Sequence, residues 1–73
     1  MHKQLVMDHT GESRHEFDPT DAAQVAEAEE RFKALTGLGF TAAEKIGDGQ
    51  SKLLRSFDPN AEETVFIPRI VGG

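Results

Sequence analysis

The 73-residue sequence has no cysteine, tryptophan or tyrosine, and five phenylalanines are its only aromatic side chains. Without cysteine there can be no disulfide bridge, no thiolate zinc site and no cysteine nucleophile. The absence of cysteine agrees with a reducing cytoplasm, and we expect a cytoplasmic location. Apolar residues nevertheless make up 37% of the chain, more than a disordered acidic segment carries. We therefore expect a single folded domain with a thin hydrophobic core.

Basic residues and long hydrophobic runs are also scarce. Eight lysines and arginines stand against thirteen acidic residues, which gives a net charge of −5. Because affinity for nucleic acid comes from clustered cations, we expect no nucleic-acid partner. The apolar run in the amino-terminal stretch MHKQLVMDH is too short for a signal peptide or a membrane span. We expect no membrane partner, and a monomer.

Catalytic motifs are missing as well. None of the serines lies in a strained elbow motif with recognisable histidine and acid partners. The stretch GDGQSK lacks the spacing of a phosphate-binding loop. His9 and His15 are weak candidates for metal ligands, because two imidazoles and a carboxylate on one strand face can hold zinc. The hairpin register predicted below points them to opposite faces, so we expect no metal, no bound cofactor and no enzyme activity.

The amino-terminal third reads as a β-hairpin. KQLVMDH and RHEF are rich in strand formers, and TGES between them supplies a glycine for a tight reversal. With Gly11 and Glu12 as the central turn residues, Asp8 is predicted to pair with His15. A one-residue bulge would change this register and exchange the two faces.

The segment from Asp18 to Gly37 is the clearest helix in the chain. Asp18 is predicted as its N-cap and Pro19 as its first helical residue. Gly37 is placed to end the helix, with Leu38 folding back onto the helix face. An apolar stripe recurs at helical spacing and is expected to face the core: Ala22, Val25, Ala28, Phe32 and Leu35.

A second hairpin and a final strand follow the helix. FTAAEKI and SKLLRSF flank the turn sequence GDGQ, and TVFI is the last strand. The triplet FDP occurs at 17–19 and at 57–59, each time at the predicted end of a strand. A lone helix must cover one face of the resulting sheet. This order indicates an α+β fold of the ubiquitin-like β-grasp type, and the rival is a two-layer α+β sandwich with a purely antiparallel sheet.

The chain closes on ETVFIPRIVGG. This ending resembles the carboxyl-terminal ends of ubiquitin-like sulfur carriers, the small subunit of molybdopterin synthase and the thiamine sulfur-carrier protein. The resemblance is confined to this segment and to the order of the elements, and Arg69 stands where the molybdopterin proteins usually have a second proline. We expect residues 1–68 to form one domain and residues 69–73 a flexible tail.

The resemblance implies a small carrier or modifier whose Gly73 carboxylate is activated by a partner, a ThiF-like adenylating enzyme of the kind that serves ubiquitin-like proteins. ATP would belong to that enzyme, and the product would be a thiocarboxylate or an amide to another protein. Gly72 and Gly73 lack Cβ atoms and can thread a narrow channel. The residues expected to bind the partner are Pro68, Arg69, Ile70 and Val71. The alternative is a non-catalytic protein–protein interaction module with a passive tail.

Overall fold

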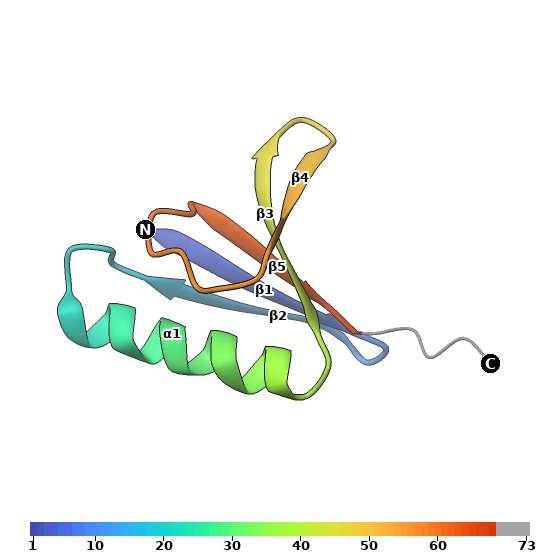
Figure 1. Ribbon diagram of the computed structural model, residues 1–73, viewed down its shortest axis with the longest axis horizontal. Coiled ribbons are helices and arrows are strands. Elements are labelled where there is room, and N and C mark those ends of the chain that lie inside the picture. Colours follow the sequence, from blue (N-terminus) through green and yellow to red (C-terminus); the bar gives the residue numbers. More distant parts are fainter. Residues whose placement is uncertain (69–73) are drawn as a thin grey trace.

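The computed structural model describes residues 1–68 and shows one helix packed on a five-stranded sheet (Figure 1). The strand order across the sheet is β2-β1-β5-β3-β4. The fold is therefore α+β, as the sequence predicts. The elements are β1 (His2–Asp8), β2 (Gly11–Phe17), α1 (Ala22–Gly37), β3 (Thr41–Gly47), β4 (Gln50–Leu54) and β5 (Glu63–Ile67).

The sheet is mixed, because β5 runs parallel to β1 while the other neighbouring strands are antiparallel. In the parallel pair Lys3 lies opposite Glu63, and Val6 lies opposite Phe66. The purely antiparallel sheet of the rival prediction is therefore wrong. The last strand enters between β1 and β3 and occupies the centre of the sheet.

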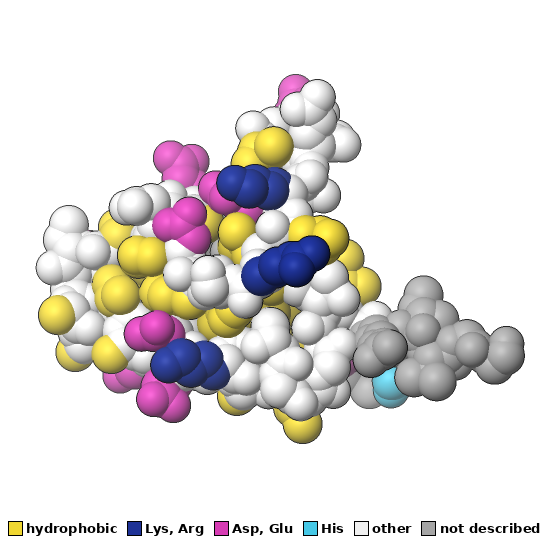
Figure 2. Space-filling model, in the orientation of Figure 1, with side chains coloured by type: hydrophobic (Ala, Val, Ile, Leu, Met, Phe, Trp, Pro, Cys, Tyr) yellow, Lys and Arg dark blue, Asp and Glu magenta, His cyan; other side chains and the backbone are white. Residues whose placement is uncertain are grey.

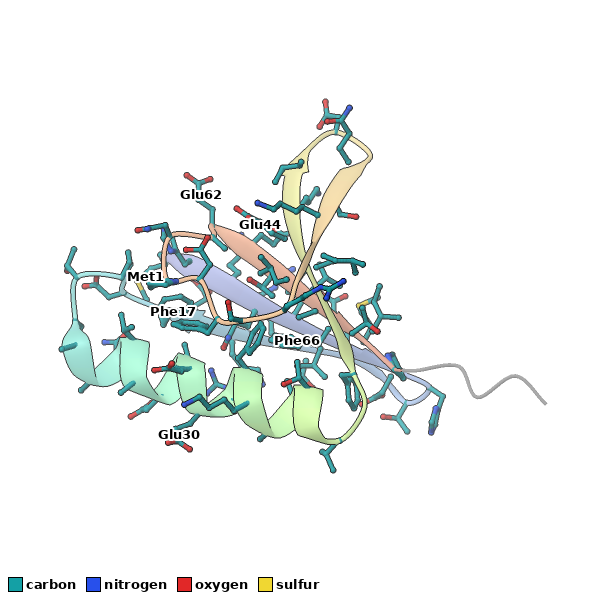
Figure 3. The ribbon with its side chains drawn as sticks, viewed as in Figure 1. Met1, Phe17, Glu30, Glu44, Glu62 and Phe66 are labelled. Carbon is teal, nitrogen blue, oxygen red and sulfur yellow. The ribbon has the colours of Figure 1, made fainter. Side chains whose placement is uncertain are left out.

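The hydrophobic core lies between α1 and the sheet. Side chains of a strand alternate between its two faces, so every second residue of β1, β3 and β5 points toward the helix. Phe66 on β5 is fully buried, and its ring lies 5.7 Å from that of Phe32 on α1. Figure 3 shows Phe17 and Phe66 between the sheet and the helix, whereas Glu30 points outward. The buried cluster is Val6, Phe32, Ala42 and Phe66, with Leu35, Phe40, Leu54 and Phe57 packed against it.

The helix begins at Ala22, three residues later than predicted. Its N-cap is Asp21, whose side chain accepts hydrogen bonds from the backbone N–H groups of Ala23 and Gln24. The prediction of Asp18 as the N-cap is therefore wrong. Both aspartates suit a cap, and Asp21 takes the role because Asp18 is already used in the turn before it.

The two FDP triplets form the same kind of turn. Asp18 Oδ1 accepts a hydrogen bond from the backbone N–H of Thr20 at 2.9 Å, and Asp58 Oδ1 accepts one from Asn60 at 2.9 Å. Each aspartate therefore closes an Asx-turn that spans its proline. The phenylalanines of the two triplets pack together, with ring centroids 6.1 Å apart. The first triplet ends a strand, because β2 runs to Phe17, but β4 ends at Leu54, so the prediction that the second triplet also ends a strand is wrong.

The carboxyl-terminal end of α1 also differs from the prediction. Gly37 belongs to the helix, and the glycine with positive φ is Gly39, at φ 100°. The backbone N–H of Phe40 donates to the carbonyl of Leu35 at 3.0 Å, which is the long hydrogen bond of a Schellman motif. Leu38 is 77% exposed, so the predicted contact of Leu38 with the helix face is wrong. The apolar contact that accompanies the cap is made by Phe40 and Leu35, which both pack against the core.

The first hairpin turns two residues earlier than predicted. Asp8 pairs with Gly11 rather than with His15, and His15 pairs with Gln4. Asp8 Oδ1 accepts hydrogen bonds from the backbone N–H and the hydroxyl of Thr10, at 2.8 and 2.6 Å. This side chain closes the turn locally, so the glycine is not needed at its centre. The second hairpin turns as predicted, at the Asp-Gly pair between β3 and β4.

Candidate functional site

The face of the sheet opposite α1 carries an apolar patch. In the sheet register Leu5 lies opposite Val65, Val65 opposite Ala43, and Ala43 opposite Leu53. Three large side chains on this face are exposed: Met7 at 40%, Ile67 at 46% and Leu53 at 66%. Among residues 1–68, no helix or strand is layered over this face. We call these six residues the open-face patch: Leu5, Met7, Ala43, Leu53, Val65 and Ile67.

A row of alternating charges crosses the same face beside the open-face patch. Lys3 on β1 lies opposite Glu16 on β2 and opposite Glu63 on β5. Lys45 on β3 completes the row, because its Nζ atom lies 3.9 Å from Glu63 Oε2. We call these four residues the charge row. In the view of Figure 2, basic side chains also lie among acidic and apolar ones, and no block of one charge sign is visible.

A shallow groove of ≈ 250 Å³ lies between β5 and the β3–β4 hairpin. Ala43, Val65 and Ile67 of the open-face patch form part of its wall, and Lys45 of the charge row contributes the only charged side chain among the described residues that line it. The groove therefore favours an apolar side chain over a charged ligand. The remaining lining residues are Gly47, Gly49, Gln50 and Ser51.

Beneath the helix, a polar cluster joins α1 to β1. Gln4 is 1% exposed, and its Nε2 donates to the carbonyl of Ala28 at 3.0 Å. Arg31 Nη1 donates to Gln4 Oε1 at 2.8 Å. His15 lies opposite Gln4 on β2, where burial and then the Arg31 charge lower the pKa of its imidazole. A neighbouring guanidinium also opposes the binding of a metal cation at His15.

The two histidines named as metal candidates are not brought together. His9 is exposed in the turn between β1 and β2, whereas the half-buried His15 pairs with Gln4 further along the hairpin. Within residues 1–68, no group of three or more histidine, aspartate and glutamate side chains is arranged to hold a metal ion. The candidates therefore gain no third ligand from the described part of the chain.

The predicted partner-binding segment begins at the end of β5. Pro68 is half-buried and directly follows this strand. Since β5 is parallel to β1, the chain leaves the sheet at the end where the β1–β2 turn lies, next to Met7 and Ile67 (Figure 1). The other predicted site residues lie outside the described residues: Arg69, Ile70, Val71, Gly72 and Gly73.

The open-face patch is not among the sites predicted from the sequence. The sequence does contain a signal for this patch. KQLVMD and ETVFI each place apolar side chains on both faces of the strand, while one helix can cover only one face of the sheet.

Within the described residues no helix is long and apolar enough to cross a membrane. No protein-family model, curated protein or solved structure matches the chain. Its function must therefore be inferred from its own residues.

Proposed function

We propose that this protein is a ubiquitin-like β-grasp carrier or modifier, whose Gly73 carboxylate is activated by a ThiF-like adenylating enzyme. The observation that carries the proposal is the place of β5, which lies at the centre of the sheet beside the parallel strand β1. A carboxyl-terminal strand inserted beside the first strand, with one helix covering the sheet, supports the β-grasp assignment. This strand leads through Pro68 into the Gly-Gly sequence.

A central strand gives the tail a fixed starting point. β5 is hydrogen-bonded to β1 on one edge and to β3 on the other, and both Thr64 and Phe66 are buried. Pro68 then ends the ladder, because it has no N–H group to donate. Five residues span at most about 18 Å when fully extended. The active site of the partner must therefore come within that distance of Pro68.

The proposed chemistry needs no catalytic side chain from this chain. A carboxylate oxygen of Gly73 attacks the α-phosphorus of ATP on the partner enzyme, and pyrophosphate leaves. A sulfur or amine nucleophile then attacks the carbonyl carbon, and AMP leaves with the bonding electron pair. The product is a thiocarboxylate or an amide. Because Gly72 and Gly73 have no Cβ, the backbone can reach a narrow active site without a steric clash.

The test compares a protein that ends at Gly73 with a variant that lacks Gly72 and Gly73. Each is incubated with cell extract and ATP and then examined by intact mass and by gel. We expect an ATP-dependent adduct, or a mass gain equal to the exchange of one oxygen for sulfur, only in the protein that ends at Gly73. The variant Gly37→Ala, which removes an exposed helical glycine, is the matched control and should react normally.

Two results would overturn the proposal. One is the absence of any ATP-dependent change in the protein ending at Gly73, and the other is the same change in the truncated variant. Both proteins must unfold at the same temperature, so that a loss of reaction is not a loss of folding.

The second candidate is a non-catalytic interaction module, and the open-face patch favours it. Exposed Met7, Ile67 and Leu53 form an apolar surface beside mixed charges, which is typical of protein–protein contact sites. If this is the function, Leu53→Ser should weaken binding to the partner, while removal of Gly72 and Gly73 should leave binding unchanged. The carrier proposal expects the truncation to abolish transfer.

A further inference from the structure

The charge row is complementary to itself. Across the sheet its members alternate in sign, from Glu16 through Lys3 and Glu63 to Lys45. Consider a second copy turned by 180° about an axis that runs parallel to the strands, midway between β1 and β5. This rotation reverses the row, so that Lys3 faces Glu63 of the second copy and Glu16 faces its Lys45. Every acid then lies against a base.

The same rotation brings apolar side chains together. It exchanges the positions of β1 and β5, which are neighbours in the sheet. Leu5, which lies opposite Val65 within one chain, then faces Val65 of the second copy. Met7 likewise faces Ile67 of the second copy, and both of these side chains are exposed in the single chain. One axis therefore satisfies both the charge row and the centre of the open-face patch.

We propose that two copies of this chain associate through the sheet face opposite α1 and form a symmetric dimer. Such an interface uses the same surface of both copies, so a self-complementary row is what it requires. The two sheets would pack face to face about 10 Å apart, with their strands roughly aligned. The proposal goes beyond the carrier function, because it uses no residue after Ile67. It replaces the monomer expected from the sequence.

The unused charges of the row support a second copy as the occupant. Within residues 1–68, Lys45 and Glu63 form an ion pair, but Lys3 and Glu16 form none. Cross-strand pairing inside one chain therefore uses only half of the row. In this row, residues at equal distances on either side of the β1–β5 boundary carry opposite charges. A symmetric dimer about that boundary requires this arrangement, whereas an unrelated partner does not.

The area of the face indicates weak association. The rotation overlays four strands of each copy, because β4 lies beyond β2 of the second copy. Four strands spaced about 4.8 Å apart, with about five residues each, form a face of roughly 320 Å² per copy. This is less than half of the roughly 800 Å² per partner in a standard interface, and it lies in the range of weak, transient contacts. The dimer should therefore form reversibly, with a population that depends on protein concentration.

A charge-swap experiment tests the dimer by sedimentation velocity over a range of concentrations. Lys3→Glu and Glu63→Lys each place like charges opposite one another, so each variant alone should need at least about tenfold more protein to dimerise. An equimolar mixture of the two variants should dimerise again, because the new acid of one faces the new base of the other. Lys33→Glu, an exposed change on α1, is the matched control and should leave the dimer unaffected.

The outcomes separate clearly. A wild-type chain that stays monomeric at all concentrations overturns the proposal. So does a pair of folded single variants that dimerise like the wild type, or whose mixture fails to dimerise. If either charge variant fails to fold by circular dichroism, Met7→Ser provides the test instead, and it must weaken the dimer. Removing residues 69–73 should change none of these results, so failure of the carrier proposal leaves this one standing.

Discussion

At the scale of single residues, Gln4 is the polar group that ties the helix to the sheet. It is nearly fully buried, and its amide group both donates to α1 and accepts from α1. A buried polar side chain costs little free energy when its hydrogen-bonding groups are satisfied. The bond from Arg31 is the vulnerable one, because the backbone carbonyl of Ala28 remains whatever side chain is substituted.

We predict that Arg31→Met lowers the free energy of unfolding by about 1–3 kcal/mol, because it leaves Gln4 Oε1 buried without a donor. The matched control is Lys33→Met on the same helix. Lys33 pairs only with Glu29, at 3.8 Å, and its side chain is 71% exposed, so the control should change stability by less than about 0.5 kcal/mol. Urea denaturation measures both. Equal effects of the two substitutions would contradict the role given to Gln4.

At the scale of elements, the end of α1 depends on one glycine that the sequence did not single out. Gly37 and Gly39 both precede an apolar residue, and either could follow the last turn of a helix. The apolar residues decide between them. Phe40 reaches the core beside Leu35 only if Gly39 adopts the left-handed conformation, whereas Leu38 remains exposed.

Substituting the two glycines should therefore have opposite effects. Gly39→Ala forces a side chain into positive φ and is expected to destabilise the protein by about 1–2 kcal/mol. Gly37→Ala replaces a helical glycine whose added Cβ would meet no atom within 4 Å, so it should stabilise by about 0.5 kcal/mol. Thermal unfolding followed by circular dichroism distinguishes the two. A destabilising Gly37→Ala would favour the cap first predicted from the sequence.

At the scale of the whole molecule, β5 joins the two hairpins into one sheet. Without it, the β1–β2 and β3–β4 pairs would share no strand contact, because β5 lies between them. The two faces of β5 lie in different environments. Phe66 fills the core against Phe32, while Ile67 lies on the open face.

Phe66→Ala should cost about 3–5 kcal/mol through lost burial and the cavity left behind. A domain of this size has a total stability of only about 4–11 kcal/mol, so the substitution should remove between about a quarter and all of the free energy of unfolding. Ile67→Ala, the adjacent residue on the opposite face, should cost less than about 1 kcal/mol in the monomer. Urea denaturation at low protein concentration compares them. Similar costs would mean that the two faces of β5 are not distinct.

Much of the fold follows from patterns that are local in the sequence. The apolar stripe of the helix from Val25 to Leu35, the Asp-Gly turn of the second hairpin and the Asx-turns of the two FDP triplets are each defined within a few residues, where propensity and turn chemistry act directly. Ala22, the first residue of the predicted stripe, is exposed. These features predict the order of the elements and the α+β class. The register of the first hairpin was wrong because Asp8 and Thr10 close a turn that does not need its glycine at the centre.

Which elements form follows from local sequence patterns, because helix periodicity, turn residues and strand formers act over short distances. The contacts between groups far apart in the sequence are visible only in the folded chain: the bond from Arg31 to Gln4, the parallel pairing of β1 with β5, and the charge row and open-face patch built by that pairing. These contacts depend on how separate elements pack, and that packing minimises exposed apolar surface over the whole chain rather than within any one segment.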